Sequence, residues 1–219
     1  MQPNGFLIVD KPAGMTSHDV VNFVRKKFKM RRVGHAGTLD PMATGVLIVL
    51  IGSWTKFFSQ FANFDKEYLV SENFSATTNT GDAQGRILRE FDYSKVTIDD
   101  IKRVFKEFTG QIQQIPPMVS AIKQQGRRLY DLARKGIELE RRPRQIFIRS
   151  IELLKFYPPF IDFKVVCSKG TYIRSLCEDI GSHLGCGGYE TALRRTRVGD
   201  FNIEEAVRLD QISESHIHN

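Results

Sequence analysis

Hydrophobic positions along this chain recur with two different periods, and the changes of period predict its elements. Strands are predicted where apolar residues alternate or run without interruption: at residues 6–9 and 46–51, around Tyr68 and Val70, from Ile146 to Ile151, and at residues 161–167. Helices are predicted where apolar residues recur every three or four positions: after Ser17 as N-terminal cap, around residues 54–61, at 97–108, near 129–133, and after Arg174.

The order of these elements indicates an α+β fold. Strands follow one another in hairpin-like succession with helices between them, which favours a mixed, mainly antiparallel sheet flanked by helices over a doubly wound parallel sheet. The chain contains no internal repeat, low-complexity tract or Pro/Ser-rich linker, so we expect residues 1–219 to form a single domain. A basic stretch at about residues 117–145 is typical of a flap-like insertion.

Positive charge is concentrated in two parts of the chain. Of the net charge of +7, residues 1–50 contribute +4 and residues 120–149 contribute +6, while the remainder sums to −3. Solvated helix faces explain many such clusters, but two of them beside glycine-rich loops favour a surface that follows nucleic-acid phosphates. Cations at the C-terminal end of the first predicted helix also have two interpretations. They stabilise the helix dipole, but five of them are more than the dipole requires, which favours contacts with nucleic-acid phosphates: Lys26, Lys27, Lys29, Arg31 and Arg32.

Composition excludes several classes of protein. With 41% hydrophobic and 26% charged residues the chain is typical of a globular protein. It has no apolar stretch near the roughly 20 residues of a membrane helix and no signal-peptide pattern, so we expect a cytoplasmic protein, and we expect a monomer. Its three cysteines are widely spaced, which indicates neither a disulfide framework nor a zinc site but reduced packing residues.

The segment from Gly34 to Gly45 is a predicted loop that holds one histidine, His35, and one aspartate, Asp40. Its three glycines permit positive φ or close approach to a ligand, and Pro41 restricts the backbone directly after Asp40. By itself, Asp-Pro is also typical of a helix N-cap followed by proline at the first helical position. The rest of the chain favours a functional carboxylate.

No phosphate-binding glycine motif of the nucleotide-binding folds occurs, so we expect no nucleotide cofactor. A metal held by His35 and Asp40 would need further ligands at short spacing, and the other histidines do not supply a pattern. We therefore expect no metal, and an aspartate-dependent metal hydrolase of nucleic acid is the weakest hypothesis.

Several separated motifs occur together. They are the Gly34 loop with Asp40, Asp10-Lys11-Pro12 with Gly14 and Thr16-Ser17, Lys66-Glu67-Tyr68, residues 115–121, residues 169–174, and residues 184–187 with Leu193-Arg194-Arg195. In this order they resemble the TruB family of tRNA pseudouridine synthases, from about Gly5 to Leu209.

The resemblance implies the pseudouridine synthase catalytic fold and isomerisation of the uridine at position 55 in the T-loop of tRNA, with the target base flipped out of its stack. It matches Asp40 to the catalytic aspartate, Tyr68 to the active-site tyrosine and Arg174 to the arginine that pairs with the aspartate. It also implies residues that contact the substrate: His35, Tyr172, Leu193 and Lys11.

The chemistry of uridine isomerisation fits an aspartate without a cofactor. The reaction breaks the C1′–N1 bond and joins C1′ to C5 with no net redox change, so a carboxylate suffices, as a nucleophile at C1′ or as a base at the sugar. An arginine beside Asp40 favours the ionised form that either route needs.

The chain departs from the family in two places. Thr78-Asn79-Thr80 stands where relatives carry an acidic residue, so we expect no role for this loop that needs charge. The chain stops soon after Asp210, so we expect no C-terminal PUA domain. A tRNA-binding or folding module without catalysis is the alternative hypothesis.

Overall fold

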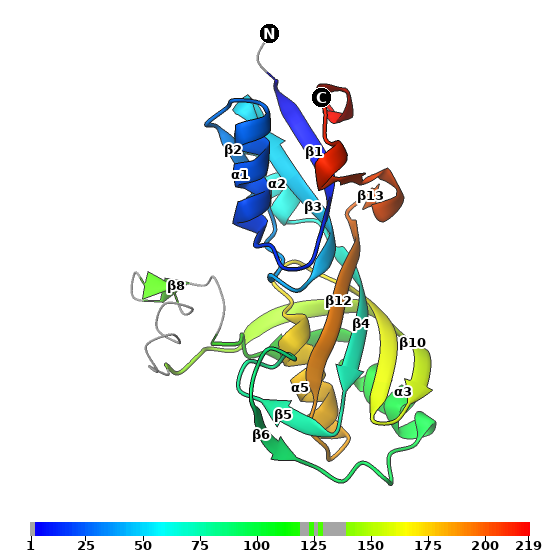
Figure 1. Cartoon of the computed structure of the whole chain (residues 1–219). Coiled ribbons are helices and arrows are strands. Elements are labelled where there is room, and N and C mark those ends of the chain that lie inside the picture. The colour runs from blue at the N-terminus through cyan, green and yellow to red at the C-terminus, as the bar shows by residue number, and fades with distance from the viewer. Residues whose placement is uncertain (1–2, 119–122, 125–126, 129–138) are drawn as a thin grey trace. The chain divides into compact units, whose positions relative to one another are not determined.

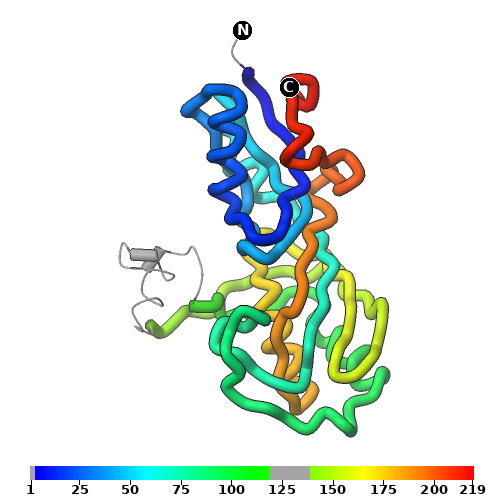
Figure 2. Tube along the Cα trace, in the orientation of Figure 1, coloured from blue at the N-terminus to red at the C-terminus, as the bar shows by residue number. Residues whose placement is uncertain are grey.

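The computed structural model describes residues 3–118, 123–124, 127–128 and 139–219. Residues up to Leu69 together with Leu193–Asn219 form one compact unit, and Val70–Ala192 form the other. The chain passes from the first unit to the second within strand β4 (Lys66–Asn73) and returns within strand β12 (Tyr189–Val198), as the trace in Figure 2 shows. Each unit is described by itself.

The first unit contains a small sheet with one long helix beside it (Figure 1). Its strand order is β14-β1-β3-β12, with β2 paired to β3 and β13 paired to β12. Besides its parts of β4 and β12, the unit's elements are β1 (Gly5–Lys11), α1 (Ser17–Lys27), β2 (Val33–Ala36), β3 (Thr44–Ile51), η1 (Gly52–Phe57), α2 (Phe58–Ala62), β13 (Phe201–Asn202), η2 (Ile203–Glu205), β14 (Val207–Arg208), η3 (Leu209–Gln211) and η4 (Glu214–His216).

Both faces of this sheet are buried, which explains why β3 is apolar at every position from Val46 to Ile51. On β1, Leu7 and Val9 pack with Val20 and Val24 of α1 on one face, because successive side chains of a strand point to opposite sides. The alternate residues of the two strands pack against an aromatic cluster on the other face, formed by Trp54, Phe57, Phe61, Phe64 and Phe201.

The predicted aromatic helix is a 3₁₀ turn followed by a short α-helix. Phe61 is buried and Trp54 and Phe57 pack against the core, as expected for a core stripe. Phe58 is 50% exposed, so the stripe is narrower than the sequence indicates. The helix after Ser17 is confirmed, but its N-cap is Thr16, whose hydroxyl accepts the N–H of Asp19 in a capping box.

The second unit has strand order β4-β11-β10-β7. Besides its parts of β4 and β12, its elements are β5 (Ala76–Thr78), β6 (Ile87–Glu90), α3 (Ile98–Phe108), β7 (Gly110–Gln114), β8 (Lys123–Gln124), β9 (Arg127–Arg128), β10 (Arg144–Tyr157), β11 (Phe160–Cys167) and α5 (Ile173–His183).

The core of the second unit follows the predicted periods. Helix α3 buries one face, Ile101, Val104, Phe105 and Phe108, and the rings of Phe105 and Phe163 lie 5.2 Å apart. Strand β11 buries every second residue from Ile161 to Cys167. The three cysteines are buried, which confirms their role in packing.

The strand pairings confirm the predicted fold class. Strand β1 pairs in parallel with β14, and β12 pairs in parallel with β3. Antiparallel pairings include β1–β3, β2–β3, β7–β10, β10–β11, β12–β13, β5–β6 and β8–β9. Strand β12 was not expected from the pattern, because buried Glu190 and Arg195 interrupt its apolar positions. None of the helices in the described ranges is long and apolar enough to cross a membrane.

The predicted flap overlaps the residues that are not described. Its predicted short helix near residues 129–133 lies outside the described residues, so the flap stays a prediction, as does the single-domain organisation. At its start, Pro116 accepts a hydrogen bond through its carbonyl from Arg141 Nη1 at 3.1 Å.

Strand β4 buries the carboxyl group of Glu72 in the second unit. Glu72 is fully buried, and the weakly donating thiol of Cys177 lies beside it. Burial raises the pKa of Glu72 well above 4.5, and the nearby thiol of Cys177 lowers it less. Glu72 therefore folds as the neutral acid.

We expect Glu72→Gln to stabilise the protein at pH 8. The unfolded chain loses the Glu72 proton above pH 4.5 while the folded chain keeps it, so stability falls as pH rises through this interval. The neutral isostere should raise the free energy of unfolding by about 1 kcal/mol or more, measured by urea denaturation between pH 5 and pH 8. Glu107→Gln on the exposed side of α3 is the control, and an equal effect of both substitutions would contradict the interpretation.

Candidate active site

The loop that carries Asp40 is shorter than predicted. Its first residues, Gly34 to Ala36, belong to β2 and its last two to β3, which leaves residues 37–43. No helix begins at Pro41, so the N-cap interpretation of Asp40 is wrong. Instead, the N–H of Ala43 donates to the carbonyl of Asp40 at 3.1 Å and closes a turn. Asp40 itself is partly exposed.

The peptide before Asp40 is held by a single hydroxyl. Ser17 Oγ donates to the carbonyl of Leu39 at 3.1 Å and accepts the N–H of the same residue at 2.9 Å. Ser17 is only 2% exposed and Leu39 is 3% exposed, so these bonds are shielded from water.

The peptide after Pro41 is held by a buried ammonium group. Lys11 Nζ donates to the carbonyls of Pro41 at 3.0 Å, Pro12 at 2.7 Å and Met15 at 2.7 Å. Burial lowers the pKa of Lys11 to about 8, with Arg195 adding to the shift and Asp40 opposing it. All three ammonium hydrogens of Lys11 thus have acceptors in the protein. The contact of Lys11 with substrate stays a prediction.

Both ends of the loop are held by a buried guanidinium group. Arg195 of β12 is 1% exposed and donates to the carbonyls of Val46 at 2.7 Å, Gly37 at 3.0 Å and Thr38 at 3.4 Å. Its backbone pairs with Gly45 of β3, where φ is +102° and a Cβ would clash with the Arg195 carbonyl, so this position requires glycine.

His35 lies on β2 opposite Val49. Its Nδ1 is buried and has no hydrogen-bond partner in the described part of the chain. Burial lowers the pKa of His35 to about 4, and the charge of Arg195 and the nearby His18 add to the shift. The imidazole is therefore neutral at pH 7.

Two other predicted site residues belong to the same unit. Tyr68 of β4 is 8% exposed, so most of its ring is packed in the protein. Leu193 of β12 is partly buried and directly precedes the two arginines of the motif.

The second unit holds Tyr172 and Arg174 at the start of α5. The side-chain amide of Gln114 accepts the N–H of Tyr172 at 2.8 Å and donates to its carbonyl at 3.0 Å. Arg174 is 4% exposed, and its Nη1 donates to the carbonyl of Thr80 at 3.0 Å. Helix α5 thus presents both residues from a fixed first turn.

The loop after β5 supplies a carboxylate that the sequence analysis did not expect. Asp82 Oδ2 lies 3.9 Å from Arg174 Nε, and Asp82 Oδ1 accepts the hydroxyl of Thr80 at 2.7 Å. The expectation that this loop has no role needing charge is therefore wrong. Asn79 stands where relatives carry the acidic residue. The carboxylate that faces Arg174 belongs to a different residue, Asp82.

The predicted site residues divide between the units: Lys11, His35, Asp40, Tyr68 and Leu193 lie in the first, and Tyr172 and Arg174 lie in the second. Pairing of Asp40 with Arg174 stays a prediction. Sequence reasoning missed the residues that brace these elements, Arg195 and Gln114 among them, and it assigned Ser17 to a cap. In the sequence, Ser17 and Arg195 are polar residues inside a motif and Gln114 directly precedes one. Nothing in the sequence indicated the partner of any of the three.

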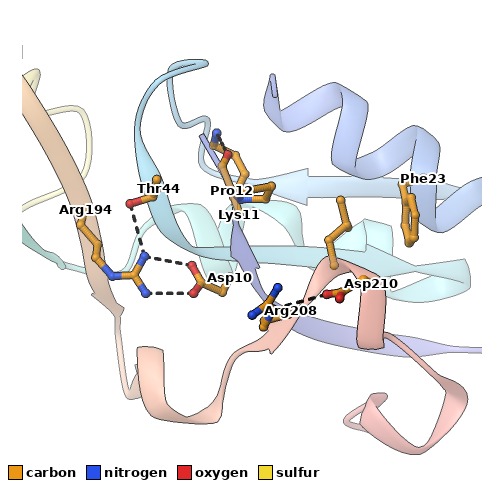
Figure 3. A pocket seen from close by; sticks show the side chains of 9 residues that line it. Asp10, Lys11, Pro12, Phe23, Thr44, Arg194, Arg208 and Asp210 are labelled. Carbon is orange, nitrogen blue, oxygen red and sulfur yellow. Dashed lines mark hydrogen bonds and ion pairs between the residues drawn. The ribbon is translucent and has the colours of Figure 1, made fainter. Parts of the chain in front are cut away.

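A pocket with a volume of about 450 Å³ lies between β1, α1 and the C-terminal segment of the first unit (Figure 3). On its wall, Arg194 donates two hydrogen bonds to the carboxylate of Asp10, at 2.9 and 3.2 Å, and one to Thr44 at 3.3 Å. At its rim, Arg208 Nε lies 3.4 Å from Asp210 Oδ1. The hydrogen bonds of Arg194 connect β12 to β1 and β3, and the Arg208–Asp210 pair lies within the C-terminal segment.

Metal ligands do not gather at the Asp40 loop. Across the described ranges, no group of three or more His, Cys, Asp or Glu side chains has the geometry to hold a metal ion.

Comparison with known proteins defines the class of enzyme. A family model described as "TruB family pseudouridylate synthase (N terminal domain)" matches residues 25–173, and one described as "tRNA pseudouridylate synthase B C-terminal domain" matches residues 174–219. These are isomerases that convert uridine to pseudouridine. The chain belongs to the TruB family of pseudouridylate synthases.

Individual relatives agree with this assignment. The chain is 49% identical to tRNA pseudouridine synthase B of Clostridium tetani, over 98% of this chain and 74% of that protein, and 48% identical to the protein of the same name from Syntrophotalea carbinolica, over 95% and 68%. Among solved structures it is similar to a chain of a Cbf5-Nop10-Gar1 complex, with TM-score 0.74 and 34% identity. That match covers 95% of this chain and 53% of the other, so the chain spans about half the length of that protein.

We expect the imidazole of His35 to stay neutral down to about pH 4, because its burial penalises the charged form. The ¹⁵N shifts of its ring nitrogens, followed by NMR between pH 7 and pH 4, measure this directly. The unfolded chain takes up this proton below pH 6.5, so stability falls as the pH drops from there towards about 4. A titration midpoint near 6.5 would contradict the burial of His35.

Proposed function

We propose that this chain isomerises uridine to pseudouridine at position 55 in the T-loop of tRNA, with Asp40 as the catalytic carboxylate. The observation that carries the proposal is the bracing of Asp40. Its backbone is held on both sides by Ser17 and Lys11 while the residue itself is partly exposed. The relatives named tRNA pseudouridine synthase B support the choice of substrate.

The isomerisation requires one oriented carboxylate, and two routes can use it. In one route an Asp40 oxygen bonds to C1′ as uracil leaves with the N1 electron pair, and C5 of the turned base then displaces the carboxylate. In the other, Asp40 removes a proton from the ribose as uracil leaves with the N1 electron pair, and returns this proton to the sugar as C5 of the turned base bonds to C1′. Both routes release the C5 hydrogen to solvent and add a proton to N1.

The second unit contributes an arginine with the properties that the proposed pairing needs. Arg174 is buried and held by Thr80 and Asp82, so its guanidinium has little conformational entropy left to lose. Paired with Asp40, it would favour the ionised carboxylate and direct one oxygen at the sugar. Tyr68 and Tyr172 would supply flat faces for the base.

Binding of tRNA would compensate for extracting the base, which costs a few kcal/mol. The exposed cations at the end of α1 are suited to phosphates: Lys26, Lys27, Lys29, Arg31 and Arg32. His35, neutral and next to the loop, is suited to filling the space that the flipped base leaves. The solved structure titled as an H/ACA RNP bound to a substrate RNA contains a similar chain, 30% identical to this one at TM-score 0.71, and supports RNA as the class of substrate.

We expect Asp40→Asn to bind tRNA normally and to release no tritium from C5-labelled uridine, because the amide neither attacks nor accepts a proton. The measurement is a single-turnover tritium-release assay with enzyme in excess. Asp200→Asn, an exposed aspartate of the same unit, is the matched control. Undiminished release by Asp40→Asn would remove Asp40 from the mechanism, and tRNA binding by the native chain without any release would favour the non-catalytic module.

We expect the double substitution Lys26→Ala/Lys27→Ala to weaken tRNA binding and to make its salt dependence shallower. Loss of two phosphate contacts should reduce the slope of log Kobs against log salt by about 1.5. Filter binding between 50 and 300 mM salt gives the slope. Lys102→Ala/Lys106→Ala, two exposed lysines of α3, is the control, and equal slopes for both double variants would place the RNA elsewhere.

A further inference from the structure

We propose that Ser17 is a positioning residue for Asp40, whose hydroxyl sets the direction of the carboxylate by fixing the peptide before it. The inference rests on the proposed function and extends it to a residue outside the reacting groups.

The hydroxyl of Ser17 is committed entirely to Leu39. It donates to the carbonyl and accepts from the N–H of that one residue, at 3.1 and 2.9 Å. The carbonyl carbon of Leu39 is bonded to the nitrogen of Asp40, so the hydrogen bond to this carbonyl orients the peptide plane from which Asp40 extends. The hydrogen bond from the N–H of Leu39 fixes the preceding peptide, between Thr38 and Leu39.

Helix α1 does not need this hydroxyl. Thr16 is the N-cap, and its side chain accepts the N–H of Asp19 while the Asp19 carboxylate accepts the N–H of Thr16 at 2.9 Å. Serine at the first helical position therefore has a hydroxyl that is free of capping and, at 2% exposure, buried against the Asp40 loop.

The loop needs an anchor on this side of Asp40. Gly37 has φ of +99°, and glycine leaves the backbone free to change direction there. On the other side of Asp40, Pro41 restricts φ, and its carbonyl accepts from Lys11 Nζ and from the N–H of Gly14 at 2.9 Å. At the beginning of this segment Arg195 donates to the carbonyls of Gly37 and Thr38, and Ser17 holds Leu39, the residue next to Asp40.

A displaced carboxylate affects the chemical step more than binding. A misplacement of about 1 Å costs roughly 100-fold in rate when a reacting group must be aligned, while contacts with the tRNA backbone are unchanged. A residue that acts only through overall stability would lower both the rate and the unfolding transition together.

The test compares Ser17→Ala with Thr16→Ala, adjacent residues whose hydroxyls serve the loop and the helix respectively. We expect Ser17→Ala to lower the saturating single-turnover rate of tritium release by about 10- to 100-fold with an unchanged Kd for tRNA. Thr16→Ala should lower the free energy of unfolding by about 1 kcal/mol and keep the rate. Amide hydrogen exchange at Leu39, followed by NMR, should become faster in Ser17→Ala and not in Thr16→Ala.

Ser17→Cys, which keeps a side chain with a weaker hydrogen-bonding group, should give an intermediate rate and decides the question if the alanine variant does not fold. A full rate in the folded Ser17 variants, or equal loss of rate in Thr16→Ala, overturns the positioning role. These outcomes are separable from failure of the proposed function. If Asp40→Asn is inactive and the Ser17 variants are fully active, only the positioning role is lost.

Discussion

The loop around Asp40 depends on buried side-chain donors, because its backbone carbonyls lie between strands and have few partners in the sheet. A buried carbonyl without a hydrogen bond costs about 1–3 kcal/mol. Lys11, Ser17 and Arg195 supply the missing donors to residues 37–46. These bonds require Lys11 and Arg195 to be removed from water, which costs free energy. The lowered pKa of Lys11 is a consequence of this burial.

The same principle positions the first turn of α5 in the second unit. The Gln114 amide holds Tyr172 by its N–H and its carbonyl, as the Ser17 hydroxyl holds Leu39. In both places one buried polar side chain holds the N–H and the carbonyl of one residue, which is Tyr172 itself in the second unit and the neighbour of Asp40 in the first. Such bonds are directional and shielded from water, so they restrict the backbone more than apolar packing does. The chain thereby positions its proposed site residues through buried polar side chains.

Polar burial has a different outcome at Glu72. The ammonium of Lys11 donates to three carbonyls and keeps its proton at neutral pH, because its pKa is lowered only to about 8. Glu72 lies beside the weakly donating thiol of Cys177, and burial favours its neutral, protonated form. One group thus contributes a charge that fixes a loop, and the other contributes a pH-dependent destabilisation. Burial alone does not decide what an ionisable residue does; its partners do.

The sequence by itself determined the elements whose apolar period is local, such as α3 and β11, and the resemblance pointed to the family and to Asp40. Only the tertiary structure decided that Ser17 braces a loop instead of capping a helix, that Lys11 is fully enclosed, and that Asp82 faces Arg174. The physical reason is distance along the chain. Helix and strand periods arise from neighbours a few residues apart, while Ser17 meets Leu39 across 22 residues and Arg195 meets Val46 across 149, so no local pattern encodes either partner.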